Sequence, residues 1–237
     1  MLDFRQWWVE RVVEEGLTAN SANKDLIHLG KILKTVNKMK RLGLVLPLSD
    51  LSLKEDEGKI RPPFSDKWIR DRLLAEGALA GLNAEARCIL LAMINTGGRP
   101  GEIANLKPKR ILLDVDIPHI VIEPDDRQVK TRHSRRVIPL TGVSLEAIRT
   151  FPGGFPRYHD NPSLSATVNK FLRQNGLMET EHHVLYSLRH SFEDRMLAAG
   201  VDDRIRRDIL GHSLTRERYG AGASLEQAHR ILQAFAL

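Results

Sequence analysis

Six residues, spread over five short motifs, combine the side chains needed to break a phosphodiester bond without a metal ion. Two arginines can clamp a phosphate through paired N–H donors, and a lysine and a histidine can move protons. A late tyrosine can attack the phosphorus, and another tyrosine precedes one of the arginines by three residues. The six are Arg99, Lys130, Tyr186, Arg189, His212 and Tyr219.

The motif TGGRPGEI surrounds Arg99 with residues that favour a sharp turn followed by a helix. Pro100 suits the first turn of a helix, so the Arg99 guanidinium is expected at a helix N-terminus, where anions are favoured. Glu102, three residues later, can accept a hydrogen bond from this guanidinium and fix its direction. An ordinary surface Arg–Glu pair near a helix start is the alternative interpretation.

In the motif YSLRHSF, Tyr186 and Arg189 are three residues apart and therefore point to one side of a helix. A phenol and a bidentate guanidinium aimed at one phosphate is the first interpretation. A core-edge tyrosine beside an exposed charge is the second. His190 points elsewhere, and we expect it to brace the helix through hydrogen bonds rather than to touch a substrate.

A basic segment between two short β-rich runs contains Lys130. Such a hairpin can enter a DNA groove and deliver one lysine to the bond that is cut, while its other cations contact phosphates. A solvated basic turn is the alternative. The accompanying arginines are Arg127, Arg132, Arg135 and Arg136.

The motif LGHSLTRERYG contains His212 and Tyr219. Because Gly211 is suited to end a helix, the His212 side chain is expected to project from a helix end. A phenol has a pKa of about 10 and is a weak nucleophile until cations and a proton acceptor lie nearby. Arg216 can supply such a cation and contact DNA. A helix-end histidine and a half-buried tyrosine are the alternatives when each residue is taken alone.

The order and contexts of these motifs resemble the signature of the tyrosine recombinase, or phage integrase, family. The resemblance covers about residues 65–225 and is specific, because five spaced motifs agree: TGGRPGEI, VKT…RRVIPL, LRHSF, LGH and ERYG. Residues 18–45 also look like the last helix of that family's N-terminal core-binding domain, which is incomplete here. The chain is then either naturally short or a fragment of a longer recombinase.

The resemblance implies a role for each of the six residues. The two arginines would hold the non-bridging oxygens, Lys130 would protonate the leaving 5′ oxygen, and His212 would hydrogen-bond the phosphate. Tyr219 would attack and form a 3′-phosphotyrosyl link, so that neither ATP nor a metal is needed. Glu102 and His190 would hold these groups in position without contacting the phosphate.

Two departures from the family pattern concern the tyrosines. The family's box usually reads His-x-x-Arg, but here it reads Tyr186-x-x-Arg189, and a phenol is a poorer base near pH 7 than an imidazole. Tyr219 follows His212 by seven residues, which is shorter than the usual spacing. The tyrosine segment is then either tighter than usual or positioned only in an assembled complex.

Apolar spacing and capping residues predict the elements that must position these groups. Helices are expected from Phe4 to about Gly16, from Ser21 to about Gly43, from Asn83 to Gly97, over 187–200, up to Gly211 and from Ser224, with helices returning after the sheet at Ser163. Strands are expected at 111–115, 119–123 and 135–140. With the resemblance, this predicts a mainly α (α+β) fold of the integrase, DNA breaking-rejoining type: a helical catalytic core with a small antiparallel three-stranded sheet.

Composition and charge divide the chain in the same way as the motifs. A charged, proline-bearing stretch at 53–64 predicts a linker, so residues 1–60 are interpreted as a partial core-binding segment and 61–237 as the catalytic domain. The chain has a net charge of +6, and most of the excess lies with the motifs. This excess favours a polyanion partner. The resemblance implies that the partner is double-stranded DNA, bound by a homo-tetramer that can be a monomer in solution.

Several kinds of site and location are not expected. Cys88, the single cysteine, lies in an apolar run, which predicts a buried, inert thiol in a reducing cytoplasm. The resemblance implies a place near the nucleoid, for a protein of a bacterium or a phage. His182, His183 and His190 lack the spacing of a zinc site, so no metal is predicted, and the glycine-rich motif lacks the Lys-Ser/Thr of a nucleotide loop. No cofactor, membrane span or signal peptide is expected.

Three functions fit these residues. The first is a site-specific recombinase or integrase, a DNA strand transferase that needs neither metal nor ATP. The second is a type IB topoisomerase, which resembles the same catalytic core, although the short chain and the LRHSF and LGH motifs favour the recombinase. The third is a DNA-binding protein of this fold with little catalysis, which Tyr186 and the short N-terminal part make plausible.

Overall fold

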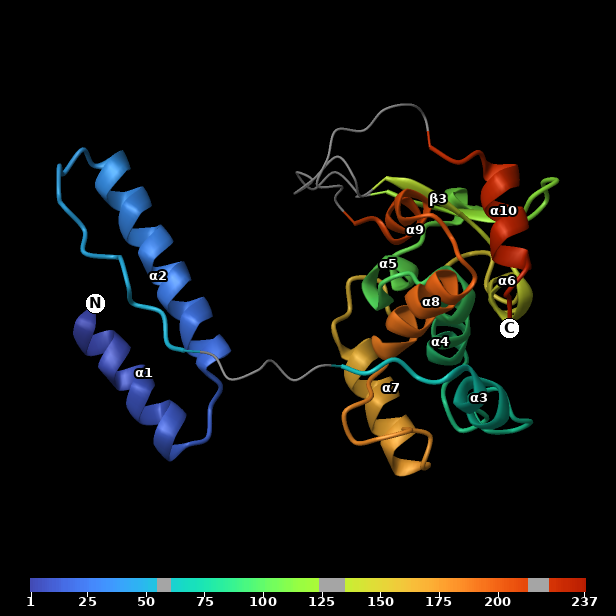
Figure 1. Ribbon diagram of the computed structural model, residues 1–237, viewed down its shortest axis with the longest axis horizontal. Helices are drawn as coiled ribbons and strands as arrows, with labels where there is room; N and C mark the ends of the chain where they lie inside the picture. The colour runs from blue at the N-terminus through green and yellow to red at the C-terminus, as the bar shows by residue number, and fades with distance from the viewer. Residues whose placement is uncertain (55–60, 124–134, 213–221) are drawn as a thin grey trace. The chain divides into compact units, whose positions relative to one another are not determined.

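The computed structural model describes residues 1–54, 61–123, 135–212 and 222–237 (Figure 1). The chain divides into two compact units, Met1–Ile60 and Arg61–Leu237. Within the described part, every helix is too short or too polar to cross a membrane.

The first unit is a pair of helices, α1 (Leu2–Glu14) and α2 (Ala19–Met39). Thr18, and not Ser21 as the sequence predicted, is the N-cap of α2, and its hydroxyl accepts a hydrogen bond from the Ser21 amide at 3.2 Å. The segment after α2 is tied back to the helix because the Asn23 side chain bonds both the amide and the carbonyl of Leu53. Two helices bury few side chains, and many apolar residues of this unit are exposed.

The second unit is mostly helical with one small antiparallel sheet, as predicted (Figure 1). The sheet has the order β1-β2-β3 and pairs His119 with Pro139 and Ile122 with Arg136. The elements are α3 (Asp66–Trp68), the π-helical turn η1 (Ile69–Leu73), α4 (Ala84–Thr96), α5 (Pro100–Ala104), the 3-10 turn η2 (Pro108–Arg110), β1 (Ile111–Leu112), β2 (His119–Ile122), β3 (Arg136–Pro139), α6 (Gly142–Arg149), α7 (Ser163–Gln174), α8 (Ser187–Ala198), α9 (Asp203–Leu210) and α10 (Leu225–Gln233).

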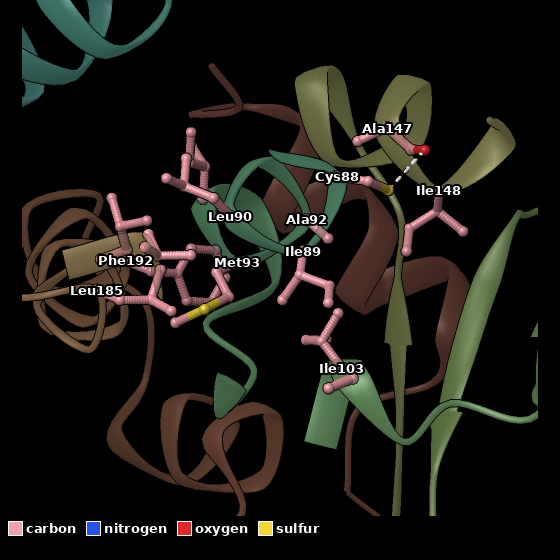
Figure 2. Close-up of a cluster of buried hydrophobic side chains, with 14 of the residues drawn as sticks. Cys88, Ile89, Leu90, Ala92, Met93, Ile103, Ala147, Ile148, Leu185 and Phe192 are labelled. Carbon is pink, nitrogen blue, oxygen red and sulfur yellow. Dashed lines mark hydrogen bonds between the residues drawn. The ribbon is translucent and has the colours of Figure 1, made fainter. Parts of the chain in front are cut away.

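Helix α4 is the centre of the second unit and is buried on almost every side (Figure 2). It packs against α6, α7 and α8, with Ile89 and Met93 fully buried among them. The sequence predicted a helix from Asn83 to Gly97 but did not predict α6 at all. Cys88 is buried as expected, its thiol donates to the Ala147 carbonyl at 2.9 Å, and burial raises its pKa to about 12.

The predicted caps of α4, α9 and α10 hold, and those at Gly97 and Gly211 place helix ends that matter for the site. Asn83 caps α4 by accepting from the Ala86 amide, and Gly97 ends the helix in the left-handed conformation with φ +58°. Gly211 ends α9 with φ +68°. Ser224 caps α10 by accepting from the Gln227 amide at 3.2 Å.

Helix α10 packs its apolar face on its own unit, with Leu232 buried and Ile231 and Phe235 against the same core. The chain beyond it is fixed to α4, since the Asn95 side-chain amide donates to the Leu237 carbonyl at 2.8 Å and its oxygen accepts from the Leu237 amide at 3.1 Å. Buried Arg195 donates in turn to the Asn95 side-chain oxygen at 3.1 Å.

Candidate active site

Arg189 is a buried arginine that joins the ends of two helices. It lies on α8 with 1 % of its surface exposed. Its Nη1 donates to the Gly97 carbonyl at 2.7 Å, where α4 ends, and its Nη2 donates to the Leu210 carbonyl at 2.6 Å, where α9 ends. The last carbonyls of a helix lack partners within it and carry partial negative charge, so both ends attract the guanidinium.

The Arg189 guanidinium lies in an environment that disfavours its positive charge. Burial, and next the nearby positive charge of Arg99, lower the pKa of Arg189 to about 10. The guanidinium is still protonated near pH 7, since about 10 is well above neutrality. Two like charges are therefore kept close together by the fold, an arrangement that a bound anion stabilises.

His212 lies against this buried guanidinium. Its Nε2 is 3.0 Å from Nη2 of Arg189, and because an arginine only donates, Nε2 is the acceptor and the ring proton is on Nδ1. Nδ1 lies 4.0 Å from the Glu193 carboxylate. Burial, and next the charge of Arg189, lower the pKa of His212 below 6.5, so the imidazole is neutral near pH 7.

Arg99 is the N-cap residue of α5 and is fixed by Glu102, as the sequence predicted. Its Nη1 donates to Oε1 of Glu102 at 2.7 Å, and its backbone N–H donates to Oε2 at 2.9 Å. Burial is the largest single effect and acts to lower the pKa of Arg99, but the charge and hydrogen bond of Glu102, joined by Tyr186, together outweigh it and raise the pKa. The side chain keeps 38 % of its surface exposed, so the guanidinium can meet a ligand from solvent.

Tyr186 stands between the first arginine and His190. It is the N-cap residue of α8, and its phenol lies near enough to the Arg99 guanidinium to help raise the pKa of Arg99. Its ring packs edge-on against His190 with 5.3 Å between centroids, and the Arg61 guanidinium is 6.0 Å from its ring. The structure thus shows a ring contact between His190 and the phenol, where the sequence predicted that His190 braces the helix through hydrogen bonds.

Arg135, which precedes β3, and Arg136, the first residue of β3, have different environments. Arg135 is exposed and pairs with Glu123. The sequence predicted a DNA contact for Arg136 as well, but the structure places this guanidinium inside the protein, with 5 % of the side chain exposed. Alternation along a strand explains the difference, since Arg136 shares the buried face of β3 with Ile138.

Glu102 receives the buried guanidinium of Arg136 as well as that of Arg99. Nη2 of Arg136 donates to Oε2 at 2.6 Å, and its Nη1 donates to Oε1 at 3.2 Å. Burial acts to raise the pKa of Glu102, but the hydrogen bond and charge of Arg136, joined by Arg99, lower it to about 2. The sequence analysis missed this link between β3 and α5.

Five predicted site residues lie outside the described part of the chain: Arg127, Lys130, Arg132, Arg216 and Tyr219. Among the described residues, no three His, Cys, Asp or Glu side chains are grouped so that they could hold a metal ion. His183 is buried and hydrogen-bonds Thr180 and the Pro63 carbonyl.

The fold and this cluster define a class of protein. Helices around a central α4, a three-stranded sheet, and a buried arginine–histidine pair beside a second arginine make a domain of the DNA breaking-rejoining type. Residues 71–218 match the Phage integrase family. The chain belongs to this family and is a tyrosine recombinase, a DNA strand transferase of site-specific recombination.

Individual relatives agree with the family assignment. The chain is 27% identical over 238 residues to tyrosine recombinase XerA of Thermococcus onnurineus (strain NA1), which covers 87% of this chain and 78% of the relative. The fold is similar to that of the Tn1549 transposon integrase in complex with transposon right end DNA, with a TM-score of 0.62 at 18% identity, covering 90% of this chain and 77% of that one. The integrase from mycobacterium phage Brujita gives a TM-score of 0.58 at 19% identity, covering 98% and 77%.

Proposed function

We propose that this recombinase cuts and rejoins DNA through a 3′-phosphotyrosyl link to Tyr219, with Arg99 and Arg189 holding the phosphate. The observation that carries the proposal is that buried Arg189 donates to the carbonyl of Gly97, two residues before Arg99. Each arginine is fixed by groups around it, and the positive charge of one lowers the pKa of the other. A phosphodiester bound between them would offset this repulsion. The effect would be largest in the transition state, when negative charge builds up on the phosphate oxygens.

The proposed cleavage step uses these two arginines together with Tyr219 and Lys130. The Tyr219 hydroxyl oxygen attacks the phosphorus, a P–O bond to tyrosine forms, and the bond to the 5′ oxygen breaks. Lys130 gives a proton to the departing oxygen, and the phenol loses its proton to solvent or to a neutral imidazole. A 5′ hydroxyl of a second strand then reverses the step, because the phosphotyrosyl link has kept a phosphoester bond.

The remaining polar groups of the cluster have supporting roles in this proposal. His212, neutral near pH 7, would hydrogen-bond the phosphate and can take up a proton. Tyr186 would donate a hydrogen bond from its phenol O–H to a phosphate oxygen. Fixed donors of this kind contribute about 3–4 kcal/mol each to transition-state stabilisation.

The first unit is proposed to hold the DNA from a second side, as a partial core-binding domain. Helix α2 carries a row of exposed cations with a single acidic residue, Asp25, among them. Such a helix favours the phosphate backbone, and this contact weakens steeply with added salt. The cations are Lys24, Lys31, Lys34 and Lys38.

Double-stranded DNA is the partner of this chemistry, and solved relatives contain it: XerH, for instance, is described as bound to its difH substrate. We propose that four copies of this chain act on two duplexes, because a complete exchange cuts both strands of each duplex, which makes four cuts in all. The place of action would be the nucleoid of a bacterium or the DNA of its phage.

The experiment traps the covalent link. The protein first selects its sites from a random duplex library, and these sites are then rebuilt with a nick beside the scissile bond, so that the freed strand diffuses away. The wild-type chain is expected to form an adduct that is sensitive to protease, while Tyr219→Phe binds equally well and forms none. Tyr186→Phe is the matched control and is expected to slow the adduct without abolishing it.

Two outcomes favour the other functions. Binding without any adduct on the selected sites would support the DNA-binding protein over the recombinase. An adduct that forms equally on unrelated duplexes, with relaxation of supercoiled plasmid, would support a topoisomerase.

A further inference from the structure

Arg136 occupies a junction that the proposed catalytic steps do not use. It lies on the buried face of β3, between the N-terminus of α5 and the C-terminus of α9. The first of these ends carries Arg99, and the second is followed directly by His212. One buried guanidinium therefore contacts both of the helix ends that present polar groups to the phosphate.

Toward α5, the contact is a fork on Glu102. Two nitrogens of Arg136 donate to the two carboxylate oxygens at 2.6 and 3.2 Å, and the same oxygens accept from Arg99. The carboxylate is thereby held by cations on two sides. Its position, and with it the direction of the Arg99 guanidinium, depends on Arg136.

Toward α9, the contact is a hydrogen bond to the last turn of the helix. Nε of Arg136 donates to the Ile209 carbonyl at 2.8 Å. Gly211 lies directly over the guanidinium, since a Cβ built on it would come within 2.7 Å of Nη1. The backbone that leads into His212 thus packs against the Arg136 guanidinium.

A buried charge at this place is not the simplest way to fill a core. Apolar side chains of similar volume often stabilise a fold as well as a buried ion pair does. A lysine would keep the charge but lose the fork, because its single ammonium cannot meet both oxygens of Glu102 and a helix carbonyl in fixed directions. The directed hydrogen bonds of Arg136 to Glu102 and to the end of α9 are the kind of contact that fixes the angle between two helices.

We propose that Arg136 is a positioning residue that sets Arg99 and His212 at a fixed separation around the scissile phosphate. This inference rests on the proposed function of those two residues. Arg136 touches no reacting atom and acts through Glu102 on one side and through the end of α9 on the other. Its loss should leave DNA affinity intact and impair the cleavage step.

The test compares Arg136→Lys and Arg136→Gln with Arg149→Gln, an exposed arginine on α6. DNA affinity is expected to stay within about twofold in all of them, because Arg136 is buried. The rate of a single cleavage at saturating DNA is expected to fall about 100-fold for both Arg136 variants, the size that a displacement of about 1 Å produces. Arg149→Gln is expected to cleave at the wild-type rate.

A second substrate separates positioning from a general loss of structure. Replacing a non-bridging oxygen of the scissile phosphate with a methyl group removes the charge that the arginines hold. On this neutral substrate the loss of cleavage rate caused by Arg136→Lys is expected to shrink to within about threefold. The double variant Arg99→Lys with Arg136→Lys is expected to lose less cleavage rate than the product of the two single losses, as coupled residues do. A structural defect would penalise both substrates equally.

A readout without DNA keeps the inference apart from the proposed function. The His212 imidazole resonance, followed by NMR against pH, is expected to titrate closer to 6.5 in Arg136→Lys than in wild type, since its contact with Arg189 is loosened. Wild-type cleavage rates in Arg136→Lys, an equal penalty on the neutral substrate, or an unchanged His212 titration would each overturn the inference. A wild-type chain that forms no adduct would instead overturn the proposed function.

Discussion

Replacing Glu102 with glutamine removes one negative charge from between two guanidinium groups and leaves the side-chain shape almost unchanged. Arg136 then keeps its charge with 5 % of its side chain exposed and no carboxylate in the fork. Removing one partner of a buried pair costs about 3–5 kcal/mol, because the remaining charge stays buried. The second unit should therefore unfold more easily.

The pKa of Glu102 gives an independent magnitude. Its fall from a usual 4.5 to about 2 corresponds to about 3 kcal/mol of stability near pH 7, at about 1.4 kcal/mol per tenfold change. The sign follows because the folded chain binds the proton less well than the unfolded chain. This stability is complete above about pH 5 and is lost as the pH falls toward 2, with about 1 kcal/mol left at pH 3.

The assay must report the second unit alone, and the tryptophans allow this. Trp7 and Trp8 lie in the first unit and are replaced with phenylalanine, which leaves Trp68, whose indole donates to the Leu177 carbonyl at 3.1 Å. Urea unfolding followed by Trp68 fluorescence is then measured from pH 7 to pH 3 for wild type, Glu102→Gln and the exposed control Glu181→Gln.

The expected difference between wild type and Glu102→Gln is about 3 kcal/mol at pH 7 and about 1 kcal/mol at pH 3. Glu181→Gln should differ from wild type by less than about 0.5 kcal/mol throughout, because its side chain is 85% exposed. A difference below 1 kcal/mol at pH 7, or one that does not change with pH, would refute the charge network.

Three further predictions concern other parts of the site and core. Gly211→Ala should lower the unfolding free energy by about 1–3 kcal/mol more than Gly200→Ala, since both have φ +68° but only Gly211 faces side-chain atoms; urea unfolding measures this, and equal losses would contradict it. His212 should titrate below 6.5 by NMR and closer to 6.5 in Arg189→Met, because burial and the arginine charge both disfavour its protonated form; an unchanged value would contradict the contact. The Cys88 thiol, with a pKa of about 12, should resist a disulfide reagent at pH 8 in the folded chain and react fully in denaturant; rapid reaction of the folded chain would contradict its burial.

Local signals in the sequence predicted most of the elements. Asn83, Gly97 and Gly211 each act at one helix end, through a side-chain cap or a left-handed glycine, so their effect does not depend on distant residues. The three strands are short runs rich in aliphatic and β-branched residues, which local composition is enough to recognise. Thr18 was missed as a cap because Ser21, three residues later, is equally suited by type.

Features that depend on distant partners could not be predicted. Helix α6 is short and starts at a glycine, and it is held by packing on α4, which local spacing does not reveal. Arg135 and Arg136 are indistinguishable by residue type, although the alternation of Arg136 with Ile138 is a signal that one of the pair faces inward. The partner that makes this burial possible, Glu102, lies 34 residues earlier in the chain.

The most direct test of the central claim is the identity of the residue joined to DNA. The chain has three tyrosines, of which Tyr158 is buried and hydrogen-bonded to Asn83 at 2.8 Å, while Tyr186 lies against Arg99. Digesting the trapped adduct with protease and nuclease and sequencing the modified peptide by mass spectrometry identifies the tyrosine. The nucleotide is expected on Tyr219, and a nucleotide on Tyr186 would contradict the account.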